Sequence, residues 1–226
     1  SADVSFSMKE DGKLRFSAAD FACDSVEGGT FAGVYFGRDG MPAHGILELK
    51  GQRLWGFEGL IPADQIDKLT YTPRSNKFGD HFDSLQFLVS DDKYFSPYAP
   101  STSYTAAIKV SEVTDRISGT KRDDNLKGLE GSNVINGKDG DDKLHGLNSS
   151  DDTFTGGRGK DIFIFASSGG RDEIRDFGKG DRISVREMDG VSNFSELQHH
   201  MRQTREGVII FDVLTDHNDQ LIIDHG

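Results

Sequence analysis

A nine-residue period runs through the middle of the chain, from Gly119 to Ile164. Read in register, the repeats are GTKRDDNLK, GLEGSNVIN, GKDGDDKLH, GLNSSDDTFT and GGRGKDIFI, and the fourth carries one additional residue. Every repeat opens with glycine, has an oxygen-bearing side chain at its sixth place and has an apolar side chain two places later. The sixth-place residues are Asp124, Asn133, Asp142, Asp152 and Asp161, and the apolar residues are Leu126, Ile135, Leu144, Phe154 and Phe163. The period predicts a turn of six residues followed by a strand of three, repeated along the chain.

The two halves of a repeat favour different chemistry. Glycine allows the turn to adopt positive φ and to direct carbonyl oxygens inward. A hard cation such as calcium takes six to eight oxygen ligands. Inward carbonyls and one carboxylate per turn supply such oxygens, and they suit calcium far better than a soft metal. One repeat cannot bury its apolar side chain alone, so the repeats must stack, and we expect ion binding to contribute to folding. The alternative, Gly-Asp turns joining ordinary short strands without a metal, is disfavoured because all the repeats keep both positions in phase.

The repeats resemble the RTX nonapeptide, GGxGxDxUx, although only GGRGKDIFI matches it at every defined position. Elsewhere Arg122 and Ser149 replace the fourth-place glycine, while Thr120, Leu129, Lys138 and Leu147 replace the second. The resemblance implies a parallel β-roll in which an ion lies between one turn and the next but one. It pairs Asp124 with Asp142, Asn133 with Asp152, and Asp142 with Asp161, which gives about three calcium ions, the Asn133 site being the weakest because it lacks a charge. The turn glycines implied as carbonyl ligands are Gly119, Gly128, Gly131, Gly137, Gly140, Gly157 and Gly159.

The composition limits the classes of partner that the chain can bind and the number of domains that it can form. The 226-residue chain has a formal net charge of -12, which disfavours nucleic acid or an anionic membrane as a direct partner. Its single cysteine excludes an internal disulfide, so calcium would have to supply rigidity in a secreted protein. No apolar run approaches the length of a membrane span, and the first residues lack the pattern of a signal peptide, so we expect either a signal already removed or export directed from the C-terminal end. A change of sequence style near residue 115 predicts two domains, 1–114 and 115–226.

The N-terminal half has the pattern of an antiparallel β-sandwich. Short β-type runs are separated by Gly, Asp and Pro turns, and a helical turn is expected at 61–69. The predicted strands lie at 13–21, 29–37, 45–51, 67–74, 82–91 and 103–113. The ordered segments FSAADFACDS, MPAHGILELKGQRL, IPADQIDKLTYTP and FGDHFDSLQFLVSDD resemble the bacterial cadherin-like domain of large surface adhesins. That resemblance implies calcium near one end, with Asp24, Glu27, Asp91 and Asp92 as the carboxylates at matching places. The alternative is that Asp24 and Asp91 only form turns.

Aromatic residues of this half are candidates for sugar binding. Trp55, Tyr94, Tyr98 and Tyr104 could offer flat faces, and the tyrosines also hydroxyl groups, to a carbohydrate. The competing interpretation places them in the core, where most aromatic residues of a sandwich lie.

The segment FASSGGRDEIRDFGKGDRISV follows the last repeat and resembles the capping segment of serralysin-type proteases. Asp172 and Asp181 within it would either add to a terminal calcium site or simply form turns. A short amphipathic helix is predicted at 193–203, with an Asn193–Glu196 capping box, and two strands around a polar turn at 207–226.

The motifs favour a binding protein over an enzyme. The sequence has no H-E-x-x-H, G-x-S-x-G or P-loop, although a polysaccharide-modifying enzyme built on other residues stays an alternative. The combination of domains resembles secreted adhesins of soil bacteria, including Rap-type calcium-dependent lectins. That resemblance implies an extracellular, monomeric protein that binds an acidic exopolysaccharide at the cell surface or in a biofilm matrix, with calcium between the carboxylates of protein and polymer. The alternative is a non-catalytic secretion, folding or protein-binding module of a type I-exported protein.

Overall fold

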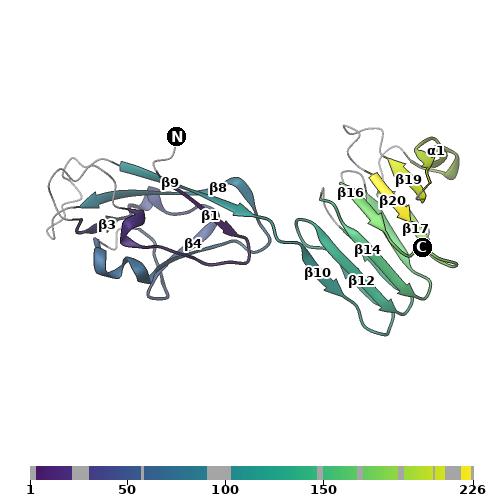
Figure 1. Ribbon diagram of the computed structural model, residues 1–226, viewed down its shortest axis with the longest axis horizontal. Coiled ribbons are helices and arrows are strands. Elements are labelled where there is room, and N and C mark those ends of the chain that lie inside the picture. Colours follow the sequence, from purple (N-terminus) through teal and green to yellow (C-terminus); the bar gives the residue numbers. More distant parts are fainter. Residues whose placement is uncertain are drawn as a thin grey trace. The chain divides into compact units, whose positions relative to one another are not determined.

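The computed structural model describes residues 4–21, 31–56, 59–90, 103–146, 150–166, 170–187, 191–205, 207–211 and 220–224. The chain divides into two compact domains, Ser1–Glu112 and Val113–Gly226. Both consist mainly of β-strands (Figure 1), which confirms the predicted all-β class. None of the helices in the described part of the chain has the length and apolarity that a membrane span requires.

Two sheets form the N-terminal domain. The first contains, in spatial order, β1 (Val4–Lys9), β9 (Ser103–Ser111), β8 (Gly79–Ser90), β3 (Gly33–Tyr35) and β6 (Ile61–Pro62). The second contains β2 (Leu14–Arg15), β7 (Leu69–Pro73), β4 (Gly45–Leu49) and β5 (Gln52–Arg53). All pairs are antiparallel except β1 with β9, which is parallel. This parallel edge strand departs from the purely antiparallel sandwich that we predicted.

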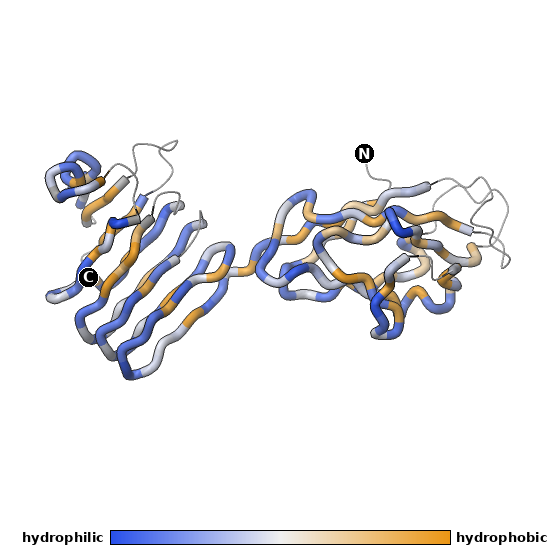
Figure 2. Tube along the Cα trace, turned by 180° about the vertical axis from the view of Figure 1, so that it is seen from behind, coloured by the Kyte–Doolittle hydropathy of each residue, from blue (hydrophilic) through white to orange (hydrophobic). Residues whose placement is uncertain are grey.

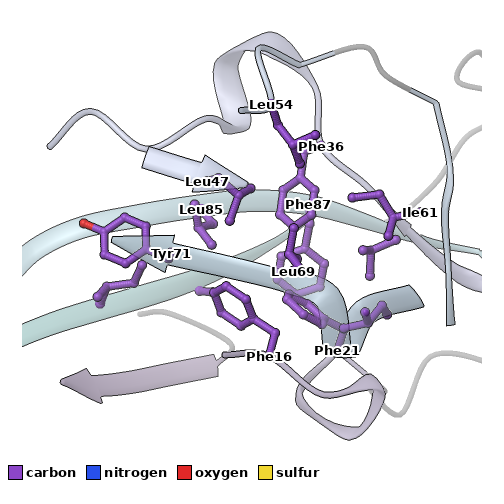
Figure 3. Close-up of a cluster of buried hydrophobic side chains, with 14 of the residues drawn as sticks. Phe16, Phe21, Phe36, Leu47, Leu54, Ile61, Leu69, Tyr71, Leu85 and Phe87 are labelled. Carbon is purple, nitrogen blue, oxygen red and sulfur yellow. The ribbon is translucent and has the colours of Figure 1, made fainter. Parts of the chain in front are cut away.

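The sandwich core is rich in aromatic rings. Phe21 meets Phe87 edge to face at 4.9 Å between ring centroids, and Phe16 and Phe36 complete the cluster (Figure 3). The predicted helical turn is the 3-10 helix η3 (Ala63–Lys68), which brings Ile66 into this core. The strand predicted at 13–21 is wrong after residue 15. The chain turns there into the 3-10 helix η1 (Ala18–Asp20), because the Asp20 carboxylate accepts hydrogen bonds from the main-chain N–H and the hydroxyl of Ser17.

The C-terminal domain is a parallel β-roll, in which successive strands alternate between two sheets. One sheet contains β10 (Asp115–Ser118), β12 (Asn133–Asp139), β14 (Thr153–Arg158), β16 (Arg171–Ile174), β20 (Gln220–Asp224), β19 (Gly207–Phe211) and β18 (Met201–Gln203). The other contains β11 (Asn125–Lys127), β13 (Lys143–His145), β15 (Ile162–Ala166) and β17 (Arg182–Glu187). Figure 1 shows β10, β12, β14 and β16 side by side. Each of these strands therefore pairs with the strand of the next repeat but one.

The apolar place of each repeat builds the core between the two sheets. One column, in exact register, contains Ile117, Ile135, Phe154, Ile174 and Ile223, and the facing column contains Leu126, Leu144, Phe163 and Ile183. Figure 2 shows the alternation that results, with hydrophobic residues along the strands and hydrophilic residues at the turns.

The roll is longer than the five predicted repeats. The segment that we expected to be only a cap forms two further rungs, β16 and β17, which keep the Asp-x-apolar order in Asp172-x-Ile174 and Asp181-x-Ile183. Before the first repeat, β10 pairs Asp115 with Asn133 in the same register. The cap proper is formed by β18, β19 and β20, of which β19 and β20 are the two predicted C-terminal strands.

The predicted helix at 193–203 is shorter in the structure. Helix α1 (Phe194–His199) begins at Asn193, whose side chain accepts the N–H of Glu196. The Glu196 carboxylate also accepts the main-chain N–H and the hydroxyl of Ser192, both at 2.7 Å. The helix ends before Met201 because 201–203 pair with β19 as a strand.

Candidate metal sites in the β-roll

The sixth-place side chains form two rows along the roll. In each step of a row, one carboxylate oxygen, Oδ1, accepts the main-chain N–H of the sixth-place residue two repeats earlier. On one side Asp142 accepts from Asp124 at 2.8 Å, Asp161 from Asp142 at 2.9 Å and Asp181 from Asp161 at 3.0 Å. On the other side Asp152 accepts from Asn133 at 2.7 Å and Asp172 from Asp152 at 3.0 Å. The three pairs expected from the sequence are thus neighbours, and Asp172 and Asp181 continue the two rows.

Two of these carboxylates are completely buried and incompletely satisfied. Asp142 and Asp161 have no solvent exposure, and the second oxygen of each, Oδ2, accepts no hydrogen bond. Burial raises the pKa of both groups, neighbouring carboxylates raise it further, and the main-chain N–H that each accepts opposes the shift. A buried, unpaired carboxylate oxygen is costly unless a cation or a proton neutralises it. The position of Oδ2 is therefore where a cation would bind.

Main-chain carbonyls face the same positions, because the first place of each repeat is glycine. A Cβ atom on Gly137 would collide with Oδ2 of Asp142 and would lie 2.6 Å from the carbonyl oxygen of Gly156, two repeats later. On Gly119 it would collide with the carbonyl oxygen of Gly137 and lie 2.9 Å from Oδ2 of Asp124. A carboxylate oxygen and a carbonyl oxygen thus converge on space that only a missing side chain leaves open.

This donor set fits calcium. In the described part of the chain, no three His, Cys, Asp or Glu side chains gather at one point. An ion in either row would be held by the aspartates of neighbouring rungs together with the carbonyls of the glycine turns. Such sets of hard oxygen atoms are what Ca²⁺ binds, in preference to softer metals that select sulfur or imidazole.

Asn133 satisfies its neighbours in a different way. Its amide nitrogen, Nδ2, donates to the carbonyl oxygen of Gly131 at 2.7 Å, to that of Leu129 at 3.1 Å and to Oδ1 of Asp152 at 2.8 Å. Nδ2 would lie 2.8 Å from a Cβ on Gly128, which is the place that Oδ2 of Asp124 takes beside Gly119. The amide hydrogens of Asn133 carry partial positive charge and donate to the surrounding oxygens. Hydrogen bonds therefore link Asn133 and Asp152 without a cation.

A second acidic row, which we did not predict, lies at the fifth place. Each of its carboxylates accepts a main-chain N–H from two repeats later, the opposite direction to the sixth-place row. Asp123 accepts from Asp141 at 2.8 Å, Asp141 from Lys160 at 2.9 Å and Asp151 from Arg171 at 2.9 Å. The signal in the sequence is the Asp-Asp doublet at 123–124, 141–142 and 151–152. These exposed groups tie the turns together and add negative charge beside the buried row.

The glycines inside the turns have the conformation expected of them. The φ angles of Gly131, Gly140, Gly157 and Gly159 are 88°, 122°, 98° and 145°. Lys138 occupies the second place of its repeat at φ 82°, a region that glycine favours, and its ammonium donates to the carbonyl oxygen of Gly119 at 2.7 Å.

The candidate ligands of the N-terminal domain are only partly described. Asp24, Glu27, Asp91, Asp92, Tyr94 and Tyr98 lie outside the described residues. The ring of Tyr104 stacks on the core residue Phe87 at 5.7 Å, so that face is engaged within the sandwich. Trp55 is 67% exposed, and the Arg53 guanidinium lies 4.1 Å from the centre of its ring.

Comparisons with known proteins agree with this arrangement in the roll. Residues 118–151, 128–163 and 147–172 match the family model of the RTX calcium-binding nonapeptide repeat. These are the residues that carry most of the two carboxylate rows, so the roll contains calcium-binding repeats of the RTX type. No curated protein matches the chain significantly. Among solved structures, the chain is similar to the crystal structure of the extracellular lipase LipA from Serratia marcescens, at 15% identity and a TM-score of 0.29. That match covers 62% of this chain and 27% of the lipase chain.

Proposed function

We propose that this chain is an extracellular calcium-binding protein whose roll folds around its ions and whose role is binding and not catalysis. The observation that carries this proposal is the buried Oδ2 atoms of Asp142 and Asp161, which lie beside Gly137 and Gly156 and accept no hydrogen bond. At Gly137 the carbonyl oxygen of Gly156 converges on the same space. The aspartates of the roll also have a structural task, since their other oxygens hold the main chain of neighbouring repeats.

The proposed ions lie at the steps of the two rows where both partners are carboxylates. On one side these steps are Asp124–Asp142, Asp142–Asp161 and Asp161–Asp181, and on the other side Asp152–Asp172. The Asn133–Asp152 step, which the sequence suggested as the weakest site, is assigned no ion because the amide already pairs with the oxygens there.

Calcium would then control when the roll folds. Where calcium is scarce, as inside a cell, repulsion between the stacked carboxylates opposes the rolled state. Where it is abundant, binding to the folded state alone shifts the equilibrium by mass action. This behaviour suits type I export, which is typical of RTX-repeat proteins.

Calorimetric titration with calcium, followed in parallel by circular dichroism, tests the proposal. We expect several ions to bind as strand signal appears, and we expect EGTA to reverse both changes. Magnesium should not replace calcium, because it requires a smaller octahedral site and gives up its water reluctantly. A spectrum that calcium leaves unchanged, in a chain that binds none, would refute the proposal.

For the ligand, we propose a carboxylated extracellular polysaccharide at the cell surface or in a surrounding matrix. Support comes from the resemblance of the N-terminal half to cadherin-like adhesin domains, from the exposed Trp55 ring and from the combination of a -12 charge with calcium sites. The alternative is a secretion or protein-binding module without a glycan ligand. Retention on immobilised polygalacturonate in calcium, compared with a neutral dextran, separates the two. Equal retention on both polymers, or on neither, would argue for the alternative.

A further inference from the structure

A groove of about 500 Å³ lies on the outer face of the sheet formed by β13, β15 and β17. Its lining includes Lys143, Ile162, Ile164, Arg182, Ser184 and Arg186. Its residues Lys143, Ile162 and Arg182 directly follow sixth-place aspartates, but they belong to the strands, whereas the carboxylates lie at the turns.

The face around the groove is basic in an acidic protein. The four strands of this sheet contain Lys127, Lys143, Arg182 and Arg186, against one acidic residue, Glu187. All four cationic residues are exposed, and none of them forms an ion pair with another side chain that the structure describes. The whole chain has a net charge of -12, so a cationic surface of this kind stands out against its surroundings.

The other sheet of the roll also has exposed cations, such as Arg116 on β10 and Arg171 on β16, but it arranges them differently. Its outward residues on β12 and β14 include Val134, Asn136, Thr153 and Thr155, which carry no charge. Directly after β16, the cation Arg175 lies 3.4 Å from Glu173 and is balanced by it. The exposed cations of this sheet are thus separated by uncharged residues, whereas Lys143, Arg182 and Arg186 line one groove on the other face.

The register of the strands aligns the cations along the roll axis. Lys143, Ile162 and Arg182 are direct neighbours on three successive strands, so two cations flank one isoleucine. With strands about 4.8 Å apart, their backbones are separated by roughly 10 Å. Lys127 belongs to the adjoining strand, β11, and Arg186 lies further along β17.

This geometry fits an extended polyanion lying across the strands. The main-chain groups of inner strands such as β13 and β15 already pair within the sheet, so a ligand on the face must be held by side chains, not by an added strand. Arginine binds a carboxylate through two parallel hydrogen bonds, and no acidic side chain lines the groove to repel one. The half-buried Ile162 and Ile164 form an apolar floor against which the faces of sugar rings can pack.

We propose that this groove binds a segment of the carboxylated polysaccharide. The inference rests on the proposed function and deepens it, because it assigns the polymer to ion pairs with Lys143, Arg182 and Arg186. In this view calcium folds the roll that displays the groove and does not itself bridge protein and polymer.

The test compares two doubly substituted chains that lose the same charge. K143Q/R182Q removes the cations that flank Ile162, and R116Q/R175Q removes two exposed cations from the outer face of the other sheet. Binding of polygalacturonate is measured by calorimetry in millimolar calcium at increasing sodium chloride, and calcium-induced folding is checked by circular dichroism. We expect about a tenfold loss of affinity for K143Q/R182Q, a change within about twofold for R116Q/R175Q, and weaker binding of the unsubstituted chain as salt rises. The single variant R182Q, with a smaller loss, replaces the double variant if the latter folds poorly.

The outcomes separate the groove from the proposed function. If the unsubstituted chain binds polygalacturonate and K143Q/R182Q binds it equally well, the groove assignment is wrong and the polysaccharide function stands. If the unsubstituted chain does not bind the polymer, the proposed ligand class is wrong and the groove assignment falls with it. If the loss in K143Q/R182Q is seen only with polyglutamate or with phosphatidylglycerol vesicles, the occupant is an acidic peptide or a membrane, and our assignment is overturned.

Discussion

The two domains bury polar groups in opposite ways. In the sandwich, the buried Asp83 accepts hydrogen bonds from the main-chain N–H groups of Ala43 and His44 and from the hydroxyl of Tyr71, all at 2.9 Å. Burial and this carboxylate together raise the pKa of Tyr71. In the roll, Asp142 and Asp161 are as deeply buried, but each keeps one oxygen without a hydrogen bond. At Asp83 the sandwich therefore satisfies a buried carboxylate with the chain's own atoms, whereas at Asp142 and Asp161 the roll leaves oxygens for which we propose a bound cation.

The domains also differ in how their contacts are distributed. In the sandwich, long antiparallel strands such as β8 and β9 pair directly, and residues of both sheets share one buried cluster. In the roll, most strands and carboxylates pair with the repeat 18 to 20 residues away, so a rung depends chiefly on its neighbours. We therefore expect the loss of one proposed ion to weaken the next rung, so that the whole roll responds to calcium.

The largest contrast is expected on removal of calcium. In EGTA, amides of the roll should lose protection against hydrogen exchange, because repulsion between stacked carboxylates is no longer neutralised. Amides of β8 and β9 should keep theirs, since the buried Asp83 on β8 is satisfied by the chain's own hydrogen bonds. Hydrogen exchange with mass spectrometry reads both domains in one sample. Protection in the roll that survives EGTA would erase the distinction between the domains.

Truncation of a core aromatic residue should act on one domain at a time. We expect Phe87→Ala to destabilise the sandwich by about 3–5 kcal/mol with or without calcium, since it opens a cavity in the aromatic cluster. Phe163→Ala should instead raise the calcium concentration needed to fold the roll, because ion binding and core packing are one transition there. Denaturant unfolding at several calcium concentrations checks both. Equal calcium dependence of the two variants would contradict the contrast.

A smaller effect is expected where a glycine opens the candidate site. Gly137→Ala places a methyl group against Oδ2 of Asp142 and the carbonyl of Gly156, so we expect a loss of about 1–3 kcal/mol and weaker calcium binding by roughly tenfold. Gly178→Ala is the matched control, because its Cβ would meet nothing closer than 3.6 Å. Calorimetry compares the two, and equal affinities would show that the space beside Gly137 is not part of an ion site.

Asn133→Asp should convert a step closed by hydrogen bonds into an ion site. The new carboxylate loses the amide donors to Gly131 and Asp152, so the metal-free roll should become less stable, while the number of bound calcium ions should rise by about one. Calcium stoichiometry measured on the folded protein decides the matter. An unchanged stoichiometry would show either that the original amide already admits an ion or that the step cannot hold one.

The smallest effect expected is that the pH dependence of the roll's stability reverses when calcium binds. The pKa values of Asp142 and Asp161 are raised in the metal-free roll, so its folded form binds more protons than the unfolded chain. Its free energy of unfolding should therefore rise as the pH falls from neutral towards about 4. With calcium bound the sign reverses, because protons compete with the ion. Circular dichroism at matched pH values in EGTA and in calcium tests this, and a common sign in both would argue against carboxylates as the ligands.

Much of the roll could be predicted from the sequence because its contacts are periodic. A spacing of nine residues places Asp142 and Asp161 one above the other on the same side and brings Leu144 and Phe163 into register. Asp172 and Asp181 were predicted as candidate ligands, but their rungs were taken for a cap because Asp172 follows Asp161 by 11 residues instead of nine. Their Asp-x-apolar order remained readable. The hydrogen bonds of the Asn133 amide could not be predicted, since an asparagine in the sequence can act either as a hydrogen-bond donor or as a neutral metal ligand.

Sequence alone determined the local chemistry: which turns need glycine, which places carry oxygen and which carry apolar side chains, since these depend on residues close together in the chain. Tertiary structure decided what depends on residues brought together by folding. It left oxygens of Asp142 and Asp161 without hydrogen bonds, paired β1 in parallel with β9 and aligned Lys143 with Arg182 on one face. The physical reason is that burial, hydrogen-bond partners and the charge of a surface depend on which residues become neighbours in space. Local sequence patterns do not show which residues those are.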